Sequence, residues 1–324
     1  MKTKQPTSIR DFSYFQTGGV ASKILMPSTL EELADQLRSL EKSTRIQLLG
    51  LGSNSLVSDD EFDGVFVLFK NLVHQTLQEK TLIVGAGVEN TKVAEIAYQK
   101  NLDGTSWLYH LPGQIGATTR MNARCYGGEI SQIVSKVVTM NFQGERREYN
   151  NKNVFRGYKD TVFMGLSEMI IEVHLSLEPM LEPLAVRQKM DYCYADRVAK
   201  GQFRAPSCGC VFKNNYQIGV PSGMLLDAAG VKNLKVGGAI VSDQHANFIF
   251  NINHASARDI LELSFIMRDK VYETFGVWLS YEMEILGTFS RELLQEYQLQ
   301  KPSMPKTSRL SPLIDRFKKS QKPL

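Results

Sequence analysis

Apolar residues recur at helical spacing in three segments of the chain, which predicts three helices. The first helix is expected over residues 29–41, with Ser28 or Thr29 as its N-cap and two glutamates in its first turn. Its apolar face consists of Leu30, Leu33, Ala34, Leu37 and Leu40. The same spacing predicts helices near residues 91–99 and 256–275.

Short apolar runs between these helices are typical of β-strands. They are Ile46–Leu49, Val65–Leu68 and Thr81–Val84. Residues 131–177 are expected to form several more strands, interrupted at Gly144 and at the Gly157 loop. Helices and antiparallel-prone strands thus interleave, which predicts an α+β fold. We expect domain boundaries near residue 70 and within residues 178–200.

Length and composition narrow the class of protein. The chain has 324 residues, of which 43% are hydrophobic and 22% charged, as in ordinary globular proteins with two or three domains. Four cysteines are too few for a disulfide framework, and the longest apolar runs are far shorter than a membrane-spanning helix. Because Met1–Arg10 is polar, we expect no secretory signal and a cytoplasmic location.

The net charge of +4 originates at the C-terminus. Residues 301–324 contain seven of the 38 Lys and Arg residues and one of the 34 acidic residues. Residues 1–300 therefore contain 31 basic and 33 acidic residues, which nearly balance. The body therefore has no signature of nucleic-acid binding. Residues 300–324 also hold four of the eleven prolines, so we expect a basic disordered tail, either a solvated extension or a contact for membrane or nucleic acid.

Two glycine patterns follow expected strands: GLGSN from Gly50 and GAG from Gly85. Neither has the third glycine of a dinucleotide-binding fingerprint. Successive backbone N–H groups around Gly52, Ser53 and Asn54 could instead form an anion nest for a pyrophosphate, or simply a tight turn. A third loop, residues 112–117, is rich in Gly, Pro and Ala and would let backbone approach a flat ligand closely.

Other common sites are disfavoured. The five histidines show no metal-ligand spacing, and Cys208-Gly209-Cys210 lacks a second thiol pair, so we expect no metal. No G-x-S-x-G motif occurs, which argues against an α/β-hydrolase.

The order and spacing of four segments resemble the UDP-N-acetylenolpyruvoylglucosamine reductase (MurB) family over about residues 10–288. The segments are FQTGGVA from Phe15, GLGSNSLVSD from Gly50, PGQIGATTRMNARCYGGEI from Pro112, and SCGCVFKN from Ser207, which is followed by GGAIVS and HANF. Each segment alone is weakly specific; their order together makes the match strong.

The resemblance implies a three-domain, FAD-binding fold of the vanillyl-alcohol oxidase (PCMH) type with a C-terminal substrate domain. We expect FAD-binding subdomains at residues 1–70 and 71–180, a UDP-sugar domain at 195–280 and a returning strand at 281–290. The implied reaction reduces an enolpyruvyl ether to a lactyl ether in peptidoglycan precursor synthesis. NADPH would reduce FAD, FAD would pass hydride to the double bond, and the protein would supply the proton.

The resemblance also implies roles for single residues. Cys210 stands where the family commonly has a serine proton donor, and a thiol can serve because its pKa is about 8.5; a packing role is the alternative. Glu282 matches the family's acidic residue, although Glu284 shares its strand face. Lys159 replaces the family's arginine, which keeps the charge but loses the two-pronged donor. Arg124, also unusual for the family, is a candidate to compensate.

The remaining site residues implied by the resemblance fall into two groups. The cofactor would be bound by Gly50, Leu51, Gly52, Ser53, Asn54, Ser55, Leu56, Pro112, Gly113, Ile115, Gly116, Ala117, Asn122 and Ala123. The substrate would be bound by Lys200, Lys213, Asn214 and His245. We expect a monomer that binds a UDP-sugar enolpyruvyl ether and NADPH, without nucleic acid or membrane insertion.

Two alternatives stay open from the residues. One is a divergent FAD-binding reductase of another unsaturated substrate. The other is a flavin- or nucleotide-sugar-binding protein without turnover, because lysine at position 159 is the weaker carboxylate partner.

Overall fold

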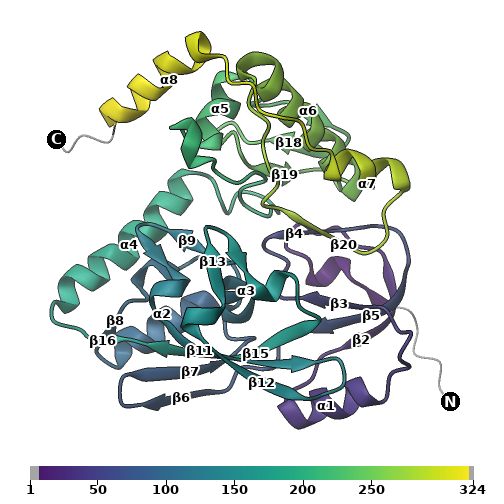
Figure 1. Cartoon of the computed structure of the whole chain (residues 1–324), viewed down its shortest axis with the longest axis vertical. Helices are drawn as coiled ribbons and strands as arrows, with labels where there is room; N and C mark the ends of the chain where they lie inside the picture. The colour runs from purple at the N-terminus through teal and green to yellow at the C-terminus, as the bar shows by residue number, and fades with distance from the viewer. Residues whose placement is uncertain (1–6, 321–324) are drawn as a thin grey trace. The chain divides into compact units, whose positions relative to one another are not determined.

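The computed structural model describes residues 7–320, which form two compact units (Figure 1). Of the described residues, unit 1 comprises Thr7, 21–51 and 63–197, and unit 2 comprises 8–20, 52–62 and 198–320. Each unit has its own buried apolar core. Residues 1–6 of the polar N-terminal segment and 321–324 of the expected tail lie outside the described residues.

Two sheets form the framework of unit 1. The first has the order β1-β2-β5-β3, with β3 and β5 parallel. Its strands are β1 (Thr7–Ser8), β2 (Val20–Leu25), β5 (Phe62–Leu68) and β3 (Ile46–Leu49). The second is antiparallel with the order β12-β11-β15-β7-β6. Its strands are β12 (Arg146–Asn150), β11 (Val134–Asn141), β15 (Glu168–Ser176), β7 (Thr81–Gly85) and β6 (Gln75–Gln78).

Helices and short strand pairs complete unit 1. The helices are α1 (Leu30–Arg38), α2 (Asn90–Gln99), α3 (Ile115–Arg120) and α4 (Pro183–Ala199). The strand pairs are β9 (Arg124–Cys125) with β10 (Gly128–Glu129), β13 (Phe155–Gly157) with β14 (Asp160–Thr161), and β8 (Leu102–Asp103) with β16 (Glu178–Pro179). Single 3-10 turns in this unit are Ser106–Leu108, Ile130–Gln132, Asn151–Asn153 and Val162–Met164.

Unit 2 is built around the long helix α6 (Ala257–Phe275), which packs against a three-stranded antiparallel sheet and against α5, α7 and α8. The sheet contains β17 (Lys235–Val236), β18 (Ala239–Val241) and β19 (Ile249–Asn251). The other helices are α5 (Ser222–Ala228), α7 (Arg291–Gln298) and α8 (Thr307–Ser320), with 3-10 turns at Arg10–Phe12 and Tyr216–Ile218. Strand β4 (Ser55–Val57) pairs in parallel with β20 (Glu284–Leu286).

The three helices expected from spacing are confirmed. Thr29 is the N-cap of α1, since its hydroxyl accepts a hydrogen bond from the Glu32 amide at 3.1 Å. Ser256 caps α6 in a reciprocal capping box with Asp259. The strands expected within residues 131–177 are also present, and Gly144 has the positive φ of +79° that its turn requires.

Helix α4 occupies most of the segment in which a domain boundary was expected. It runs through residues 183–199, and the change from unit 1 to unit 2 falls near its end, after Arg197. The first two expected subdomains both lie largely in unit 1. The three-part division itself stays a prediction.

The expectation of a disordered tail over residues 300–324 is wrong for its described part. Residues 307–320 form α8, whose Leu310 is buried, and Leu313, Ile314 and Phe317 pack against the core of unit 2. These four residues follow helical spacing, so one face of a basic segment can still be buried. The composition of residues 300–324 did not indicate this apolar face, because lysine, arginine and proline make up much of the segment.

An extended strap leads into α8 along the end of α6. The Met304 amide donates to the Gly276 carbonyl at 2.7 Å, and the Lys306 amide donates to the Phe275 carbonyl at 2.8 Å. The indole Nε1 of Trp278 donates to the Leu299 carbonyl at 3.2 Å. The C-terminal region is thus bonded into unit 2 through its backbone.

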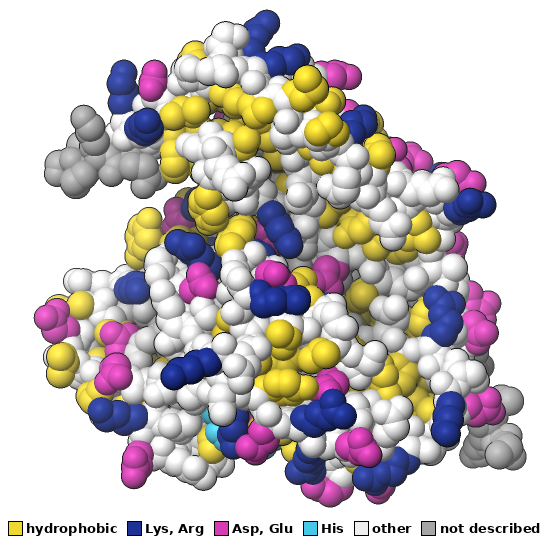
Figure 2. All heavy atoms as spheres, in the orientation of Figure 1, with side chains coloured by type: hydrophobic (Ala, Val, Ile, Leu, Met, Phe, Trp, Pro, Cys, Tyr) yellow, Lys and Arg dark blue, Asp and Glu magenta, His cyan; other side chains and the backbone are white. Residues whose placement is uncertain are grey.

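No helix within residues 7–320 has the length and apolar character needed to cross a bilayer. On the face of the molecule that Figure 2 shows, basic and acidic side chains are interspersed. This mixture agrees with the near balance of charge in residues 1–300.

Leu310→Ala should lower the free energy of unfolding of unit 2 by about 2–5 kcal/mol, because it removes a buried side chain. Trp278 fluorescence during urea unfolding, in a Trp107→Phe background, reports this unit. Leu184→Ala on α4 is the control, since that side chain is largely exposed and its loss should change stability by less than about 0.5 kcal/mol. Equal effects of the two variants would mean that α8 does not contribute to the core.

Candidate functional site

The glycine turn after β3 leads into a segment that is anchored in unit 2. Gly52 has a φ of +68°, a conformation that glycine adopts without strain. The Asn54 amide Nδ2 donates to the Glu282 carbonyl at 3.0 Å, and the Glu284 amide donates to the Asn54 carbonyl at 3.0 Å. Asn54 and strand β4 after it are therefore bonded to the segment of residues 282–286, while Gly50 and Leu51 belong to unit 1.

The loop at residues 112–117 lies close against the backbone after β7. The Ile115 amide donates to the Val88 carbonyl at 2.8 Å, and the Gly116 amide donates to the Ala86 carbonyl at 3.0 Å. A Cβ on Gly116 would come within 2.7 Å of the Ala86 Cβ, so glycine is required for this approach. The structure thus gives Gly116 a packing role against Ala86, while the expected approach of this loop to a flat ligand stays a prediction.

Gln114 carries a buried side-chain oxygen that has no hydrogen-bond donor among the described residues. Its side chain is buried, and its Oε1 atom accepts no hydrogen bond within the described residues. A buried acceptor without a donor costs about 1–3 kcal/mol. A Cβ on Gly50 would lie 3.2 Å from this oxygen, so the first glycine pattern and the loop at 112–117 meet at this point.

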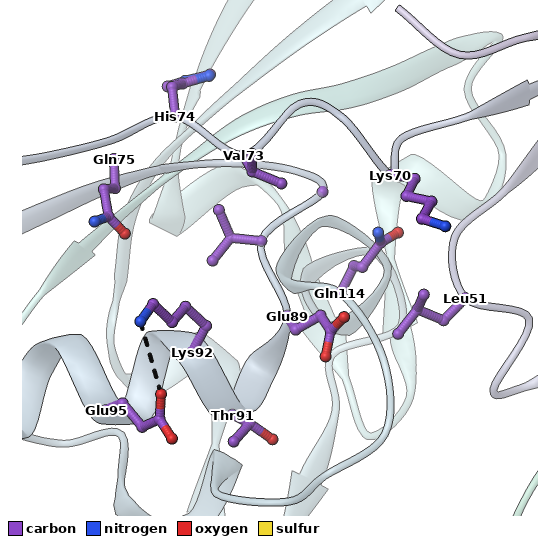
Figure 3. A pocket seen from close by; sticks show the side chains of 12 residues that line it. Leu51, Lys70, Val73, His74, Gln75, Glu89, Thr91, Lys92, Glu95 and Gln114 are labelled. Carbon is purple, nitrogen blue, oxygen red and sulfur yellow. Dashed lines mark ion pairs between the residues drawn. The ribbon is translucent and has the colours of Figure 1, made fainter. Parts of the chain in front are cut away.

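Gln114 also lines a pocket of about 790 Å³ in unit 1 (Figure 3). Lys70 comes from the segment after β5, and Lys92 and Glu95 come from α2, where they form an ion pair at 3.8 Å. Leu51 contributes apolar surface. The pocket thus combines cations, acceptors and apolar walls, as small-ligand sites commonly do.

Asn122 fixes the loop that follows α3. Its Nδ2 donates to the Glu129 carboxylate at 2.9 Å and to the Gly157 carbonyl at 2.8 Å, and its Oδ1 accepts from the Ser131 amide at 3.3 Å. Asn122 therefore joins the β9–β10 pair to the β13–β14 hairpin. Ala123 next to it is buried, and its amide donates to the Thr118 carbonyl.

The two candidate cations of unit 1 lie in these two joined segments. Lys159 is at the tip of the β13–β14 hairpin with a φ of +54°, and it is 8% exposed. Arg124 is on β9, about half exposed, with its Nε 3.9 Å from a Glu129 carboxylate oxygen. Of the two cations, Lys159 is the buried one, whereas Arg124 forms an ion pair with Glu129.

Arg197 is a residue that the sequence did not single out. It is 2% exposed near the end of α4, and its guanidinium donates to the carbonyls of Trp107, Tyr109 and Cys193 at 2.9–3.1 Å. A further donor lies 3.4 Å from the Cys125 sulfur. Burial raises the pKa of Cys125 to about 11, although Arg197 and then Lys159 oppose this rise.

The role of Arg197 is to hold the segment before and after the 112–117 loop. Its guanidinium also lies 4.6 Å from the centre of the Tyr126 ring, whose hydroxyl donates to Asp196 at 2.7 Å. The one sequence signal was the i, i+4 spacing of Cys193 and Arg197 on one helix face. That spacing could not reveal the carbonyl partners.

In unit 2, the segment carrying Cys210 lies beside the segment carrying Glu282. Cys210 forms an isolated antiparallel bridge with Phe248, and Phe212 forms one with Tyr281. The Glu282 amide donates to the Val211 carbonyl at 2.8 Å. The two expected catalytic residues of this unit are therefore brought together by backbone pairing.

The expected substrate residues of unit 2 lie around this pairing, with Lys200 as the exception. The Lys213 amide donates to the Ser280 carbonyl at 2.9 Å, and Asn214 Oδ1 accepts from the Ser222 amide at 2.9 Å. The His245 ring stacks on Phe248, the bridge partner of Cys210, at 4.1 Å. Lys200 is exposed just after α4.

Within residues 7–320, no group of three or more His, Cys, Asp or Glu side chains is arranged to hold a metal ion.

Comparison with domain families defines the class. A domain family described as "FAD binding domain" matches residues 21–148, which are nearly all in unit 1. A second, described as "UDP-N-acetylenolpyruvoylglucosamine reductase, C-terminal domain", matches residues 201–286 of unit 2. The chain is thus an FAD-dependent oxidoreductase with an FAD-binding domain of the PCMH type and a separate C-terminal domain, as the sequence predicted.

Whole-chain relatives define the family. The chain is 32% identical to the UDP-N-acetylenolpyruvoylglucosamine reductase of Exiguobacterium sibiricum, with 86% of this chain and 91% of that protein covered. It is 31% identical to the enzyme of the same name from Borrelia garinii subsp. bavariensis, with 87% and 93% covered. The MurB crystal structure from Thermus caldophilus superposes with a TM-score of 0.72 at 30% identity, covering 87% and 98%. The chain belongs to the UDP-N-acetylenolpyruvoylglucosamine reductase family.

The residues of unit 1 fit FAD, the cofactor that the family uses. The orphaned Gln114 oxygen offers an acceptor, and Gly50 next to it carries no side chain. Which of the individual residues touch the cofactor stays a prediction.

Gly116→Ala should weaken FAD binding about tenfold or more, because the added methyl group pushes the loop away from Ala86 and such overpacking costs about 1–3 kcal/mol. The measurement is flavin absorbance per polypeptide after dialysis against graded FAD. Gly165→Ala is the matched control, since its Cβ would have no neighbour closer than 3.9 Å. Full FAD retention by Gly116→Ala would contradict the placement of the cofactor at this loop.

Proposed function

We propose that this chain reduces the enolpyruvyl double bond of UDP-N-acetylglucosamine enolpyruvate to give UDP-N-acetylmuramate, with NADPH as the electron donor. The family and the names of the relatives support this reaction. The observation in this chain that carries the proposal is the pairing that sets Cys210 beside Glu282 in unit 2. When bound, FAD would provide the chemistry that carries hydride from NADPH to the substrate carbon.

The cofactor would be held mainly by uncovered backbone. The anchored segment 52–56 offers amide donors to a pyrophosphate, as do Gly50 and Leu51 before it. In the second loop the contacts would come from Pro112, Gly113, Ile115, Gly116 and Ala117, with Asn122 and Ala123 beyond them. The amides of Ile115 and Gly116 already donate to Val88 and Ala86, so these two residues would contribute van der Waals contact. The side chain of Asn122 is already hydrogen-bonded to Glu129, Ser131 and Gly157, so Asn122 would act by positioning the loop.

Cys210 is proposed as the proton donor to the carbon next to the one that receives hydride. The residue is partly exposed. Glu282 on the neighbouring segment would polarise or hydrogen-bond the substrate carboxylate and the developing enolate. A positioned acid of this kind typically contributes about 10²–10⁴-fold to the rate.

The substrate carboxylate also needs a cation. Lys159 is proposed to supply the charge, because it is buried at a hairpin tip that the Asn122–Gly157 hydrogen bond holds. Arg124 is proposed to supply the two-pronged contact that lysine lacks. Lys200, Lys213, Asn214 and His245 are proposed to bind the UDP-sugar. We also propose that the protein acts as a cytoplasmic monomer.

Cys210→Ala should leave reduction of the flavin by NADPH nearly unchanged and slow its reoxidation by substrate about 10²–10⁴-fold. Cys210→Ser should retain much more of the reoxidation rate, since a hydroxyl can also donate a proton. Stopped-flow absorbance of the flavin separates the two half-reactions. Equal damage to both half-reactions in Cys210→Ala would indicate a packing role instead.

The same assay distinguishes the alternatives from the proposal. Reoxidation of the reduced flavin by UDP-N-acetylglucosamine enolpyruvate supports the proposed reaction. A protein that is reduced by NADPH but not reoxidised by this compound would act on another substrate or only bind flavin.

A double-mutant cycle of Lys159→Met and Arg124→Met tests the shared role of the cations. If both contact the carboxylate, their effects on substrate-dependent reoxidation should couple by about 0.5–3 kcal/mol. Glu129→Gln is the control for the ion pair with Arg124. Additive effects, with Arg124→Met close to wild type, would leave Lys159 acting alone.

A further inference from the structure

Unit 2 holds two thiols one residue apart. Cys208 and Cys210 flank Gly209, and neither is in a disulfide. Cys208 is 4% exposed within the apolar core of the unit, whereas Cys210 is partly exposed. One thiol is thus accessible to a small oxidant, and the other is sheltered next to it in sequence.

The backbone at Gly209 favours closure between these thiols. A fully extended chain separates residues i and i+2 by about 7 Å, at the edge of what a disulfide tolerates. Here the chain bends at Gly209, whose φ is +74°, so the two Cα atoms are closer than in an extended chain. A Cβ at this position would have no neighbour within 4 Å, so the turn has room to adjust.

The surroundings of Cys208 disfavour its thiolate form. Burial raises the pKa of Cys208 well above its usual value, and Cys210 and then Glu282 raise it further. Cys208 is therefore a neutral thiol at ordinary pH, close to Cys210 and poorly reactive by itself. The more exposed Cys210 is the thiol that would meet an oxidant first.

We propose that Cys208 and Cys210 form a reversible disulfide after a peroxide oxidises Cys210, and that this modification removes the proton donor of the enzyme. In the first step the Cys210 sulfur attacks hydrogen peroxide, which gives a sulfenic acid and one water. In the second step the Cys208 sulfur attacks that sulfenic sulfur and loses its proton, and a second water leaves. Two thiols are oxidised by two electrons, and the peroxide is reduced to two waters.

A disulfide between Cys208 and Cys210 would close a small ring, and the strain in that ring determines how easily the disulfide is reduced. A disulfide between residues i and i+2 is strained, and strained disulfides are the more easily reduced ones. A dithiol should therefore restore both thiols, whereas without Cys208 the sulfenic acid of Cys210 is open to irreversible oxidation. The inactivation, but not the disulfide itself, rests on the proposed role of Cys210.

The test treats the FAD-loaded, full-length protein with a small excess of hydrogen peroxide, followed by alkylation and trypsin. Both thiols fall in one peptide, Ala205–Lys213, because cleavage follows Arg204 and Lys213. We expect this peptide to be unalkylated and lighter by two hydrogens than its reduced form. Substrate-dependent flavin reoxidation should fall about 10²-fold or more, as for loss of a general acid, and dithiothreitol should restore it to within about twofold.

Two variants sharpen the test. Cys208→Ser should lose reoxidation under peroxide without recovery in dithiothreitol, and its peptide should gain oxygen. Cys193→Ser is the matched control, because Cys193 is a buried cysteine of unit 1 and its loss should leave the disulfide unchanged. A peptide 205–213 that stays reduced while activity falls would overturn the proposal. Disulfide formation with unchanged reoxidation would sustain the modification site and overturn the role of Cys210 as proton donor.

Discussion

The parallel pairing of β4 with β20 is the constraint on which the arrangement of unit 2 depends. Ser55–Val57 and Glu284–Leu286 are more than 220 residues apart, yet their backbones pair in register. The Asn54 side chain adds a bond to the Glu282 carbonyl, so the glycine turn and the acidic residue are fixed by the same strand pair. Because Glu282 then pairs with Val211, the position of Cys210 follows from this contact.

In unit 1 the corresponding constraint is the close packing of the loop at residues 112–117 against the backbone after β7, which requires glycine at the contact. Gly116 approaches Ala86 so closely that a methyl group does not fit, and Gln114 is left buried with an unused acceptor. Arg197 supports this arrangement from the end of α4: it donates to two carbonyls before the loop, and it contacts the Cys125 sulfur and the Tyr126 ring after the loop. The structure therefore keeps an unsatisfied polar atom in a rigid frame, which is typical of a preformed ligand site.

Unit 2 continues beyond its matched domain family, which ends at residue 286, into α7, the strap and α8. Arg268 of α6 is buried there with its guanidinium 4.1 Å from the Trp278 ring, and it donates to the Glu296 carboxylate and carbonyl. The Lys301 Nζ lies 4.7 Å from the centre of the same indole. A lysine of the segment that looks like a solvated tail in sequence is thus packed on an aromatic side chain.

Much of the protein was readable from sequence because its signals are local. Helix spacing and capping residues predicted α1, α2 and α6, and short runs predicted β3, β5 and β7, since these depend on neighbours within a few residues. Ordered motifs identified the family, the fold and FAD. They also named Cys210 and Glu282, which the structure places side by side.

Tertiary structure decided what depends on distant partners. The sequence did not predict that Arg197 would bind the carbonyls of residues 107 and 109, or that Gln114 would be left without a donor. It predicted disorder where α8 forms, because burial of Leu310 requires a surface built by other segments. A side chain's partners are set by the packing of elements far apart in the chain, and single-sequence patterns carry no information about that packing.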